Sequence, residues 1–242
     1  MSAGTVALFR EDPYLAAADA VVEAVVEGGG IVFDRTLFYA RGGGQPGDTG
    51  FVELADGRRL AVADTIHGVD ERGRIVSMLA EPADPGLAGA RVTLHLDWPR
   101  RYRIMRMHTA LHLLSVALPY PVTGGQIGPD ESRLDFDIPD AGLEREEIAA
   151  RVNGMIAADH PVVEAWITDE DLDKAPDLVK TMKVKPPRGS GRVRLVRIGE
   201  DVDLQPCGGT HVRSTGEIGG IVVLKIEKKG RQNRRVRIAL AD

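Results

Sequence analysis

Two short motifs, almost a hundred residues apart, constrain this chain more than any other feature. The first, HTALH, runs from His108 to His112, and the second, CGGTH, runs from Cys207 to His211. Three imidazoles and one thiolate make a suitable donor set for a tetrahedral zinc ion. A fold that uses all four donors must bring the two motifs together in space.

The first motif lies in a segment that predicts an amphipathic helix from Arg103 to Leu118. Apolar residues recur there at helical spacing, at Ile104, Met107, Leu111, Leu114 and Leu118. Residues four positions apart share a helix face, so His108 and His112 can present two imidazoles to one point. In the second motif, two glycines permit a tight loop that brings thiol and imidazole together.

Each motif alone has a plainer interpretation. A histidine on an amphipathic helix is commonly an exposed or satisfied side chain, and a lone cysteine is commonly a small buried hydrophobe. The two motifs are stronger together, because they contain the only cysteine of the chain and three of its six histidines. The donor types and their spacing therefore favour metal binding.

Composition bounds the class of protein. A chain of 242 residues, 43% hydrophobic and 28% charged, is long enough for one large domain or two modest ones. No apolar run reaches the roughly 20 residues of a membrane span, and the N-terminus has no secretion signal. A single cysteine excludes an intrachain disulfide, so we expect a cytoplasmic protein without membrane partners.

The N-terminal part predicts a small antiparallel β-barrel-like domain over residues 1–96. A strand is expected at Thr5–Phe9, the Ala- and Val-rich segment 14–26 fits helix or strand, and a glycine-rich motif, GGGQPGDTG, covers 42–50. No Lys-Ser/Thr follows those glycines, so phosphate-loop chemistry is not expected. Short strands separated by turn residues follow, at 51–54, 59–64, 74–79 and 90–96.

The part from residue 97 to 242 predicts an α+β domain. The metal helix begins near Trp98-Pro99 and ends before Pro119, and a glycine-containing connection at 123–128 precedes a strand at 133–138. A helix is expected from Asp140 to about Asp159, then a strand at 162–167 and a short helix capped by Thr168 and stopped by Pro176. Strands at 193–198, 218–226 and 235–240 are expected to complete one antiparallel sheet.

Three segments carry a family resemblance. HTALHLL at His108, RLDF at Arg133 and CGGTHV at Cys207 resemble the editing domain of alanyl-tRNA synthetases and its free-standing relatives, the AlaX trans-editing proteins. The resemblance spans about Trp98 to Ile238, with the motifs in the same order. The glycine-rich motif is similar to that of the domain preceding the editing domain in the longer, medium-length members.

The resemblance implies an activity. It implies a zinc-dependent aminoacyl-tRNA deacylase that hydrolyses tRNA(Ala) carrying the wrong amino acid in trans, chiefly serine and also glycine. The metal ligands, through which catalysis would act, would be His108, His112, Cys207 and His211. A chain whose two parts are already assigned has no room for ATP-using chemistry, and a monomer is expected.

The resemblance also directs attention to substrate contacts. Serine differs from alanine by one hydroxyl, and a buried polar group left unpaired costs about 1 to 3 kcal/mol, so hydrogen-bonding groups can favour serine. The candidates are Gln45, Asp48, Thr49, Gln126, Asp135, Gly208, Gly209 and Thr210. Without the resemblance, Asp135 is an ordinary polar strand residue and Gln126 a surface loop residue.

Basic residues gather late in a chain whose formal net charge is -5. The tRNA-binding candidates are Arg188, Arg192, Lys228, Lys229, Arg234 and Arg235. Such runs bind RNA phosphates if they collect on one side of the fold. The alternative is a solvated surface with no nucleic-acid role.

Other functions fit part of the pattern. A metal-free hydrolase using Cys207 and His211 leaves His108 and His112 unexplained. A non-catalytic zinc-containing RNA-binding module fits both the ligands and the basic clusters, and a broader aminoacyl-ester hydrolase fits the metal. A complete synthetase is excluded, because an ATP-using catalytic domain has no place in the chain.

Overall fold

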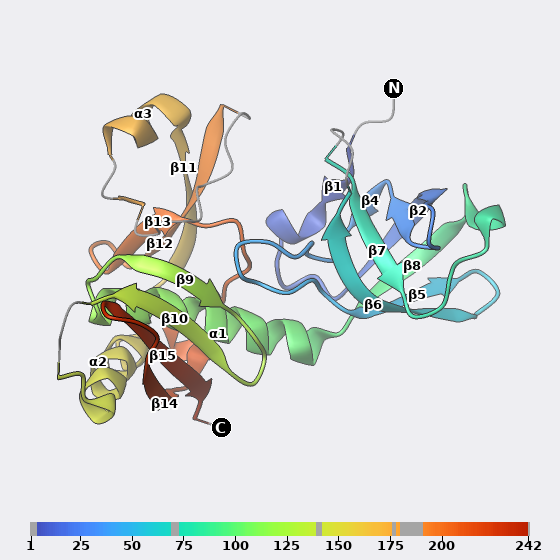
Figure 1. Cartoon of the computed structure of the whole chain (residues 1–242). Coiled ribbons are helices and arrows are strands. Elements are labelled where there is room, and N and C mark those ends of the chain that lie inside the picture. The colour runs from blue at the N-terminus through green and yellow to red at the C-terminus, as the bar shows by residue number, and fades with distance from the viewer. Residues whose placement is uncertain (1–3, 69–72, 139–141, 176–177, 180–190, 242) are drawn as a thin grey trace. The chain divides into compact units, whose positions relative to one another are not determined.

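The computed structural model describes residues 4–68, 73–138, 142–175, 178–179 and 191–241. Asp140, Pro176 and Arg188 therefore lie outside the described residues. The chain divides into two compact units (Figure 1). The first contains Met1–Gly42 and Pro46–Tyr102, and the second contains Gly43–Gln45 and Arg103–Asp242. Three residues of the glycine-rich motif thus belong to the second unit.

The first unit is a closed six-stranded barrel with the strand order β2-β3-β7-β6-β5-β8. Its strands are β2 (Ala17–Val25), β3 (Ile31–Phe33), β5 (Gly50–Leu54), β6 (Arg59–His67), β7 (Ile75–Leu79) and β8 (Arg91–Leu96). Neighbouring barrel strands are antiparallel where their register is defined. Two short strands, β1 (Val6–Ala7) and β4 (Arg35–Thr36), pair in parallel beside it. The predicted barrel is confirmed.

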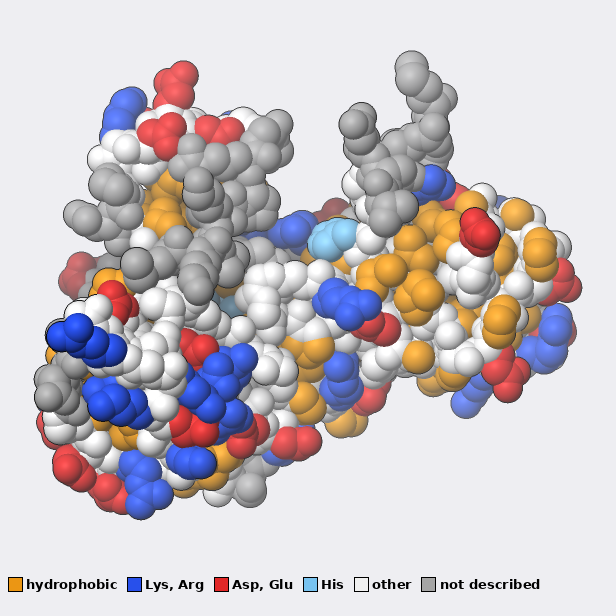
Figure 2. Space-filling model, viewed as in Figure 1, with side chains coloured by type: hydrophobic (Ala, Val, Ile, Leu, Met, Phe, Trp, Pro, Cys, Tyr) orange, Lys and Arg blue, Asp and Glu red, His pale blue; other side chains and the backbone are white. Residues whose placement is uncertain are grey.

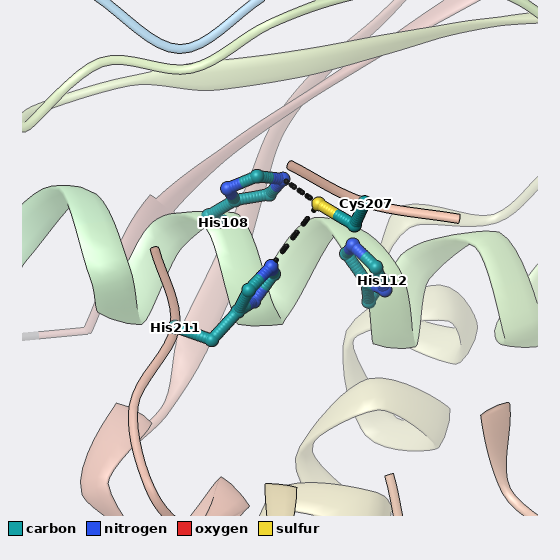
Figure 3. Close-up of side chains that lie close together, drawn as sticks. All are labelled: His108, His112, Cys207 and His211. Atoms are coloured by element: carbon teal, nitrogen blue, oxygen red, sulfur yellow. Dashed lines mark hydrogen bonds between the residues drawn. The ribbon is translucent and has the colours of Figure 1, made fainter. Parts of the chain in front are cut away.

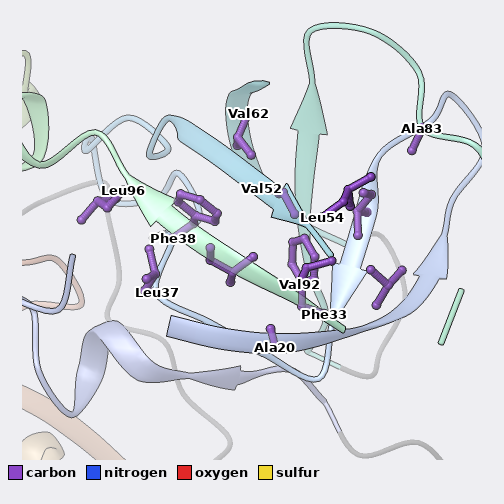
Figure 4. Packing of buried hydrophobic residues seen from close by; sticks show 13 residues of the cluster. Ala20, Phe33, Leu37, Phe38, Val52, Leu54, Val62, Ala83, Val92 and Leu96 are labelled. Atoms are coloured by element: carbon purple, nitrogen blue, oxygen red, sulfur yellow. The ribbon is translucent and has the colours of Figure 1, made fainter. Parts of the chain in front are cut away.

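The barrel is filled by residues at alternate strand positions. In β8, Val92, Leu94 and Leu96 are buried while the residues between them are partly exposed, as the two-residue period of a strand requires. Figure 4 shows Val92 and Leu96 in the buried cluster that also contains Phe33 and Phe38. Full burial of a side chain of this size contributes about 1.5 to 3 kcal/mol, so the core holds the unit together.

The segment 14–26, which fitted helix or strand, contains β2. Its Ala20 and Val22 are buried in the barrel, and its backbone pairs with β3 and β8. The strand predicted at Thr5–Phe9 is wrong in its second half, because Leu8–Arg10 form a turn of 3-10 helix that buries Phe9. A second 3-10 turn, Pro85–Leu87, precedes β8.

In the described part of the second unit, three α-helices accompany two antiparallel sheets. The helices are α1 (Trp98–Ala117, of which Trp98–Tyr102 count with the first unit), α2 (Arg145–Ala157) and α3 (Asp169–Lys174). One sheet has the order β14-β15-β10-β9, and the other has the order β11-β12-β13. Their strands are β9 (Val122–Gln126), β10 (Ser132–Asp137), β11 (Val162–Thr168), β12 (Arg192–Ile198), β13 (Asp203–Pro206), β14 (Ile221–Lys228) and β15 (Asn233–Leu240). The predicted α+β class is confirmed.

Helix α1 is buried on nearly every side, so the prediction of an amphipathic helix is wrong. Polar Thr109 and Ser115 are as inaccessible as Leu111. Strand β13, the loop after it and the 3-10 helix Thr215–Ile218 all donate or accept hydrogen bonds to α1 side chains. Because several segments surround the helix, its polar residues face protein instead of water. In the part of the chain that is described, no helix is long and apolar enough to cross a membrane.

Two strands of the second unit were missed by the sequence patterns. The predicted connection at 123–128 contains β9, in which Gly124 and Gly125 pair with Asp135 and Leu134 of β10. A strand ladder needs only backbone groups, and a Cβ on Gly125 would lie 2.9 Å from the Leu134 side chain, which explains the glycine. Strand β13 is short, polar and ends in proline, so no strand pattern revealed it.

The prediction of one sheet for the last three strands is also wrong. Strand β12 pairs with β11 and β13, whereas β14 and β15 pair with each other and with β10. Strand β14 begins at Ile221 and not at Ile218, because Thr215–Ile218 form a 3-10 helix with a capping box between Ser214 and Glu217.

Candidate metal centre

Four side chains from two elements converge in the second unit. His108 and His112 lie one turn apart on α1, while Cys207 and His211 lie in the loop after β13 (Figure 3). One donor atom from each of the four residues lies within 4.8 Å of the other three. The three histidines are buried and Cys207 is half-buried. This group could hold a metal ion.

The distances fit a tetrahedral ion. The Cys207 Sγ lies 3.4 Å from His108 Nε2 and 3.2 Å from His211 Nε2. A tetrahedral zinc with ordinary Zn–S and Zn–N bonds separates sulfur from nitrogen by about 3.5 Å. The donors therefore stand close to the positions that a metal of this kind requires.

The remaining ring nitrogen of His112 is held by a carboxylate. His112 Nδ1 lies 2.9 Å from Asp203 Oδ2. The same oxygen accepts a bond of 2.7 Å from Gln205 Nε2, which also donates to Ser115 Oγ at 3.3 Å. A carboxylate accepts, so Nδ1 carries a proton and donates it, and Nε2 is the nitrogen left for a metal.

The Nδ1 of His108 is held by Gln45. Gln45 Oε1 accepts the backbone N–H of Thr210 at 3.0 Å, and Gln45 Nε2 donates to the Thr210 hydroxyl at 2.9 Å. The backbone donor fixes which end of the amide is oxygen, and this oxygen lies 3.0 Å from His108 Nδ1. His108 Nδ1 therefore donates, and its Nε2 faces the sulfur.

The Nδ1 of His211 is held by Thr109, its neighbour across the site. The Thr109 hydroxyl donates its one hydrogen to the Met105 carbonyl at 2.9 Å, so it can only accept from His211 Nδ1, 3.1 Å away. All three imidazoles thus donate from Nδ1, which leaves Nε2 as the nitrogen for a metal. Partners of this kind orient and support metal-binding histidines.

Electrostatics in the cluster favour a thiolate. Burial raises the pKa of the Cys207 thiol, but the adjacent His108 and His211 hold it well below its ordinary value. Burial lowers the pKa of His112, yet Asp203 and Cys207 outweigh burial and raise that pKa to about 9. Burial, followed by His108, lowers the pKa of His211 to about 3. The thiolate is the form in which cysteine binds metals.

The CGG loop is shaped for close contact with His108. A Cβ on Gly209 would lie 2.3 Å from His108 Cε1 and 2.6 Å from Gln45 Oε1, whereas a Cβ on Gly208 would have no atom within 4 Å. Arg194 of β12 clamps the loop by donating to the carbonyls of Cys207 at 2.7 Å and Gly209 at 3.0 Å. Glycine at 209 is therefore a packing requirement of the site.

Comparison with known proteins gives a consistent picture. Residues 193–237 match the family model described as the threonyl and alanyl tRNA synthetase second additional domain. The alanyl-tRNA editing protein AlaX-M of Methanosarcina mazei is 37% identical over 98% of this chain and 97% of its own length. This chain belongs to the AlaX family of alanyl-tRNA editing proteins. The resemblance seen in the motifs is confirmed.

Two longer relatives, an AlaX-L protein and an alanine–tRNA ligase, match this chain over part of their own length. The AlaX-L protein of Pyrococcus horikoshii is 36% identical over 95% of this chain and 56% of its own length. The alanine–tRNA ligase of Pyrobaculum arsenaticum is 37% identical over 91% of this chain and 25% of its own length. This AlaX-family chain thus corresponds to a quarter of that ligase and to nearly all of an AlaX-M protein.

Two predicted substrate contacts of this AlaX-family chain lie in the first unit. Asp48 is buried and ion-paired with the buried Arg101, and it also accepts the Tyr39 N–H at 2.5 Å. Thr49 Oγ1 lies 3.2 Å from a carboxylate oxygen of Asp97, to which it donates. A buried charge needs such a partner, so Asp48 has a structural function in the barrel unit.

Two further predicted contacts lie on neighbouring strands. Gln126, exposed at the end of β9, accepts a long bond of 3.4 Å from Arg133. Asp135 of β10 is bound by Arg133 at 2.7 Å and by Arg235 at 2.7 and 2.9 Å. Burial raises the pKa of Asp135, but Arg235 and Arg133 bring it below its ordinary value. Asp135 is therefore an anion held between two cations.

The predicted tRNA-binding residues are distributed over two sheets. Arg192 is exposed at the start of β12, and Lys228 and Lys229 are exposed at the end of β14. Arg234 is buried and donates to backbone carbonyls, while Arg235 binds Asp135. Figure 2 shows Lys and Arg side chains interspersed with Asp and Glu over β10, β14 and β15. Arg192, Lys228 and Lys229 are the exposed members among those that the structure describes.

Four residues important to the centre were missed from the sequence. Asp203, Gln205 and Thr109 hold imidazoles or their partners, and Arg194 holds the CGG loop. Two of them could have been noticed in the sequence. Asp203 and Gln205 occupy alternate positions in the short segment that leads to Cys207. Arg194 was concealed within a basic cluster, and Thr109 looked like an ordinary helical residue.

Proposed function

We propose that this chain is a zinc-dependent deacylase that removes the wrong amino acid, chiefly serine and also glycine, from tRNA(Ala) in trans. The observation that carries the proposal is the convergence of three imidazoles and one cysteine sulfur, each ring already held by a partner at Nδ1. Relatives of nearly equal length are alanyl-tRNA editing proteins. Nitrogen and sulfur donors in a tetrahedral set favour zinc over magnesium or calcium.

The chemistry follows from the ligand set. A zinc ion held by His108, His112, Cys207 and His211 supplies Lewis-acid chemistry for hydrolysis of an ester. The protein residues orient the rings and keep the ligand nitrogens away from bulk water. The ester between an amino acid and the ribose of tRNA is more reactive than an amide, so modest catalysis suffices.

A separate site is needed because alanine and serine are similar in size. A pocket built for a methyl group cannot strongly reject a side chain that merely adds a hydroxyl. We propose that Gln126, Thr49 and the loop residues Gly208 and Thr210 contact the substrate. Gln45, Asp48, Gly209 and Asp135 have partners in the fold and would act through the positions of their neighbours.

Recognition of the RNA would be electrostatic. We propose that Arg192, Lys228 and Lys229, with Arg188, Arg234 and Arg235, face phosphates of the acceptor end. The exposure of both lysines on β14 supports this arrangement. Phosphate contacts of this kind position a nucleic acid without reading its bases. We propose that residues 1–96 form the β-barrel-like domain and that residues 97–242 form the editing domain.

The activity is tested by following amino-acid release from purified tRNA(Ala) charged with serine, glycine or alanine. We expect serine to be released much faster than alanine, since destruction of the correct product would drain the cell of Ala-tRNA. His108→Ala should abolish release from every substrate, and Asp201→Asn, in the exposed turn before β13, should remain active.

The other outcomes identify the alternatives. Equal release of serine and alanine would indicate a broader aminoacyl-ester hydrolase. Binding of tRNA with one zinc per chain but no release would indicate a non-catalytic RNA-binding module. Full activity after complete removal of the metal would contradict zinc dependence.

A further inference from the structure

One buried carboxylate stands behind the metal centre and is distinct from the four donors. The Asp203 side chain is 0% exposed, and its Oδ2 lies 2.9 Å from Nδ1 of His112, whose side chain is 7% exposed. We infer that Asp203 is the positioning residue of this centre, a carboxylate that acts through His112 to set metal affinity. The inference rests on the metal centre of the proposed function and deepens it.

The bonding around Asp203 leaves His112 one orientation. Asp203 Oδ2 also accepts the Gln205 amide N–H at 2.7 Å, and Gln205 continues the network to Ser115 on α1. A ring flip would replace the His112 N–H with a carbon beside the carboxylate and remove one hydrogen bond from a buried anion. Breaking such a pair is costly because an uncompensated charge stays buried. The imidazole is therefore held with Nε2 available to the metal.

The three imidazoles have unequal supports. The partner of His108 is a neutral amide, Gln45, and the partner of His211 is a neutral hydroxyl, Thr109. Only His112, among the three ligand histidines, donates to a carboxylate. A negative acceptor increases the electron density of the ring and its strength as a ligand. His112 should therefore contribute most to affinity.

The backbone explains how this carboxylate is placed. Asp203 begins β13, where it pairs with Ile198 of β12, and β13 continues through Pro206 directly to Cys207. A single four-residue strand thus supplies the support of one ligand at its start and leads into another ligand at its end. The pairing of β13 with β12 therefore fixes the positions of Asp203 and Cys207 together.

The test uses Asp203→Asn and Asp203→Ala in the full chain. Competition with a chromophoric chelator would measure zinc affinity, and the absorption spectrum of the Co²⁺ form would report ligand geometry. Removing an outer partner of a ligand histidine typically costs 10- to 100-fold in metal affinity. We expect a loss of that order, about 100-fold, for Ala, and a smaller loss, about 10-fold, for Asn, whose amide oxygen can accept from Nδ1 but has no charge.

Asp201→Asn is the matched control. Asp201 lies two residues away in the exposed turn before β13, so this variant removes the same charge outside the network. Its zinc affinity and Co²⁺ spectrum should match the wild type. Circular dichroism of the metal-free proteins would establish that each variant folds, and if the Ala variant does not fold, the Asn variant decides.

Two results would overturn the inference. The first is a folded Asp203 variant with wild-type zinc affinity and an unchanged Co²⁺ spectrum. The second is an equal loss of affinity in Asp201→Asn, which would indicate a general effect of charge. Neither readout requires tRNA. A protein that binds zinc through this network but releases no amino acid would contradict the proposed function alone.

Discussion

The metal centre and the charged face of β10, β14 and β15 both consist of polar side chains, yet they are constructed differently. In the centre, the polar groups are buried and each ring nitrogen has one defined partner. On the charged face, the one carboxylate of Glu227 contacts three cations, Lys225, Lys229 and Arg237. The side chains of both lysines are exposed. Buried bonds fix geometry, whereas exposed ion pairs contribute little and are screened by salt.

One methyl group added to the loop of the centre should change zinc affinity more than any substitution on the charged face. We expect Gly209→Ala to lower zinc affinity at least about 10-fold, a loss typical of a disturbed ligand support. The new Cβ would overlap the His108 ring, with a closest approach of 2.3 Å. Chelator competition would measure the change. Gly208→Ala is the matched control, since a Cβ there meets nothing within 4 Å and Gly208 has no positive φ. Equal effects at 208 and 209 would contradict the packing argument.

Loss of the amide behind His108 should have the next largest effect. We expect Gln45→Leu, which keeps the approximate size of the side chain, to lower zinc affinity about 10-fold, because the acceptor for Nδ1 is removed. The Thr210 N–H would lose its partner as well. Isothermal titration with zinc would report the change. An unaltered affinity together with a changed serine-to-alanine ratio would instead place Gln45 at the substrate, as its sequence motif predicted.

The sequence predicted the four donors from paired spacing, and the structure brings them together. It could not predict their supports, because partners such as Gln45 and Asp203 reach the centre through the tertiary fold and not through spacing. The barrel was predictable because its turns are marked by Gly, Pro and Asp. By contrast, β9 was missed because glycines conceal a strand that pairs by backbone alone, and α1 appeared amphipathic because its polar side chains have buried partners.

Protonation of the centre gives a smaller but specific signal. In the metal-free protein the pKa of His112 is raised to about 9, while the pKa of Cys207 is lowered well below its usual value. His112 is therefore protonated near neutral pH, and the thiol ionises at a lower pH than an ordinary cysteine. Zinc binding should release about one proton, because the metal displaces it from His112. The release should decline above the raised pKa, as His112 becomes neutral before metal arrives.

Calorimetry in buffers of different ionisation enthalpy would count these protons. Asp203→Asn removes the carboxylate that raises the His112 pKa, so fewer protons should be released near neutral pH. A release of about two protons near neutral pH in the wild type would show that the thiol is protonated too and would contradict the charge distribution described for the centre.

Changes on the charged face should affect folding least. We expect Lys228→Gln with Lys229→Gln to leave zinc content and melting temperature unchanged, because both side chains are exposed. The affinity for tRNA should fall, and the slope of log affinity against log salt should decrease by about one for each phosphate that the variant no longer neutralises. Unchanged affinity and slope would show that this face is only a solvated surface.

X-ray absorption at the zinc edge, on protein purified with its metal, tests the central claim most directly. We expect one zinc per chain with three nitrogen neighbours at about 2.0 to 2.1 Å and one sulfur at about 2.3 Å. The sulfur shell should disappear in Cys207→Ser while the nitrogen shell persists. A shell of oxygen alone, a sulfur shell that survives the substitution, or a folded protein that retains no zinc would contradict a zinc centre built from these four residues.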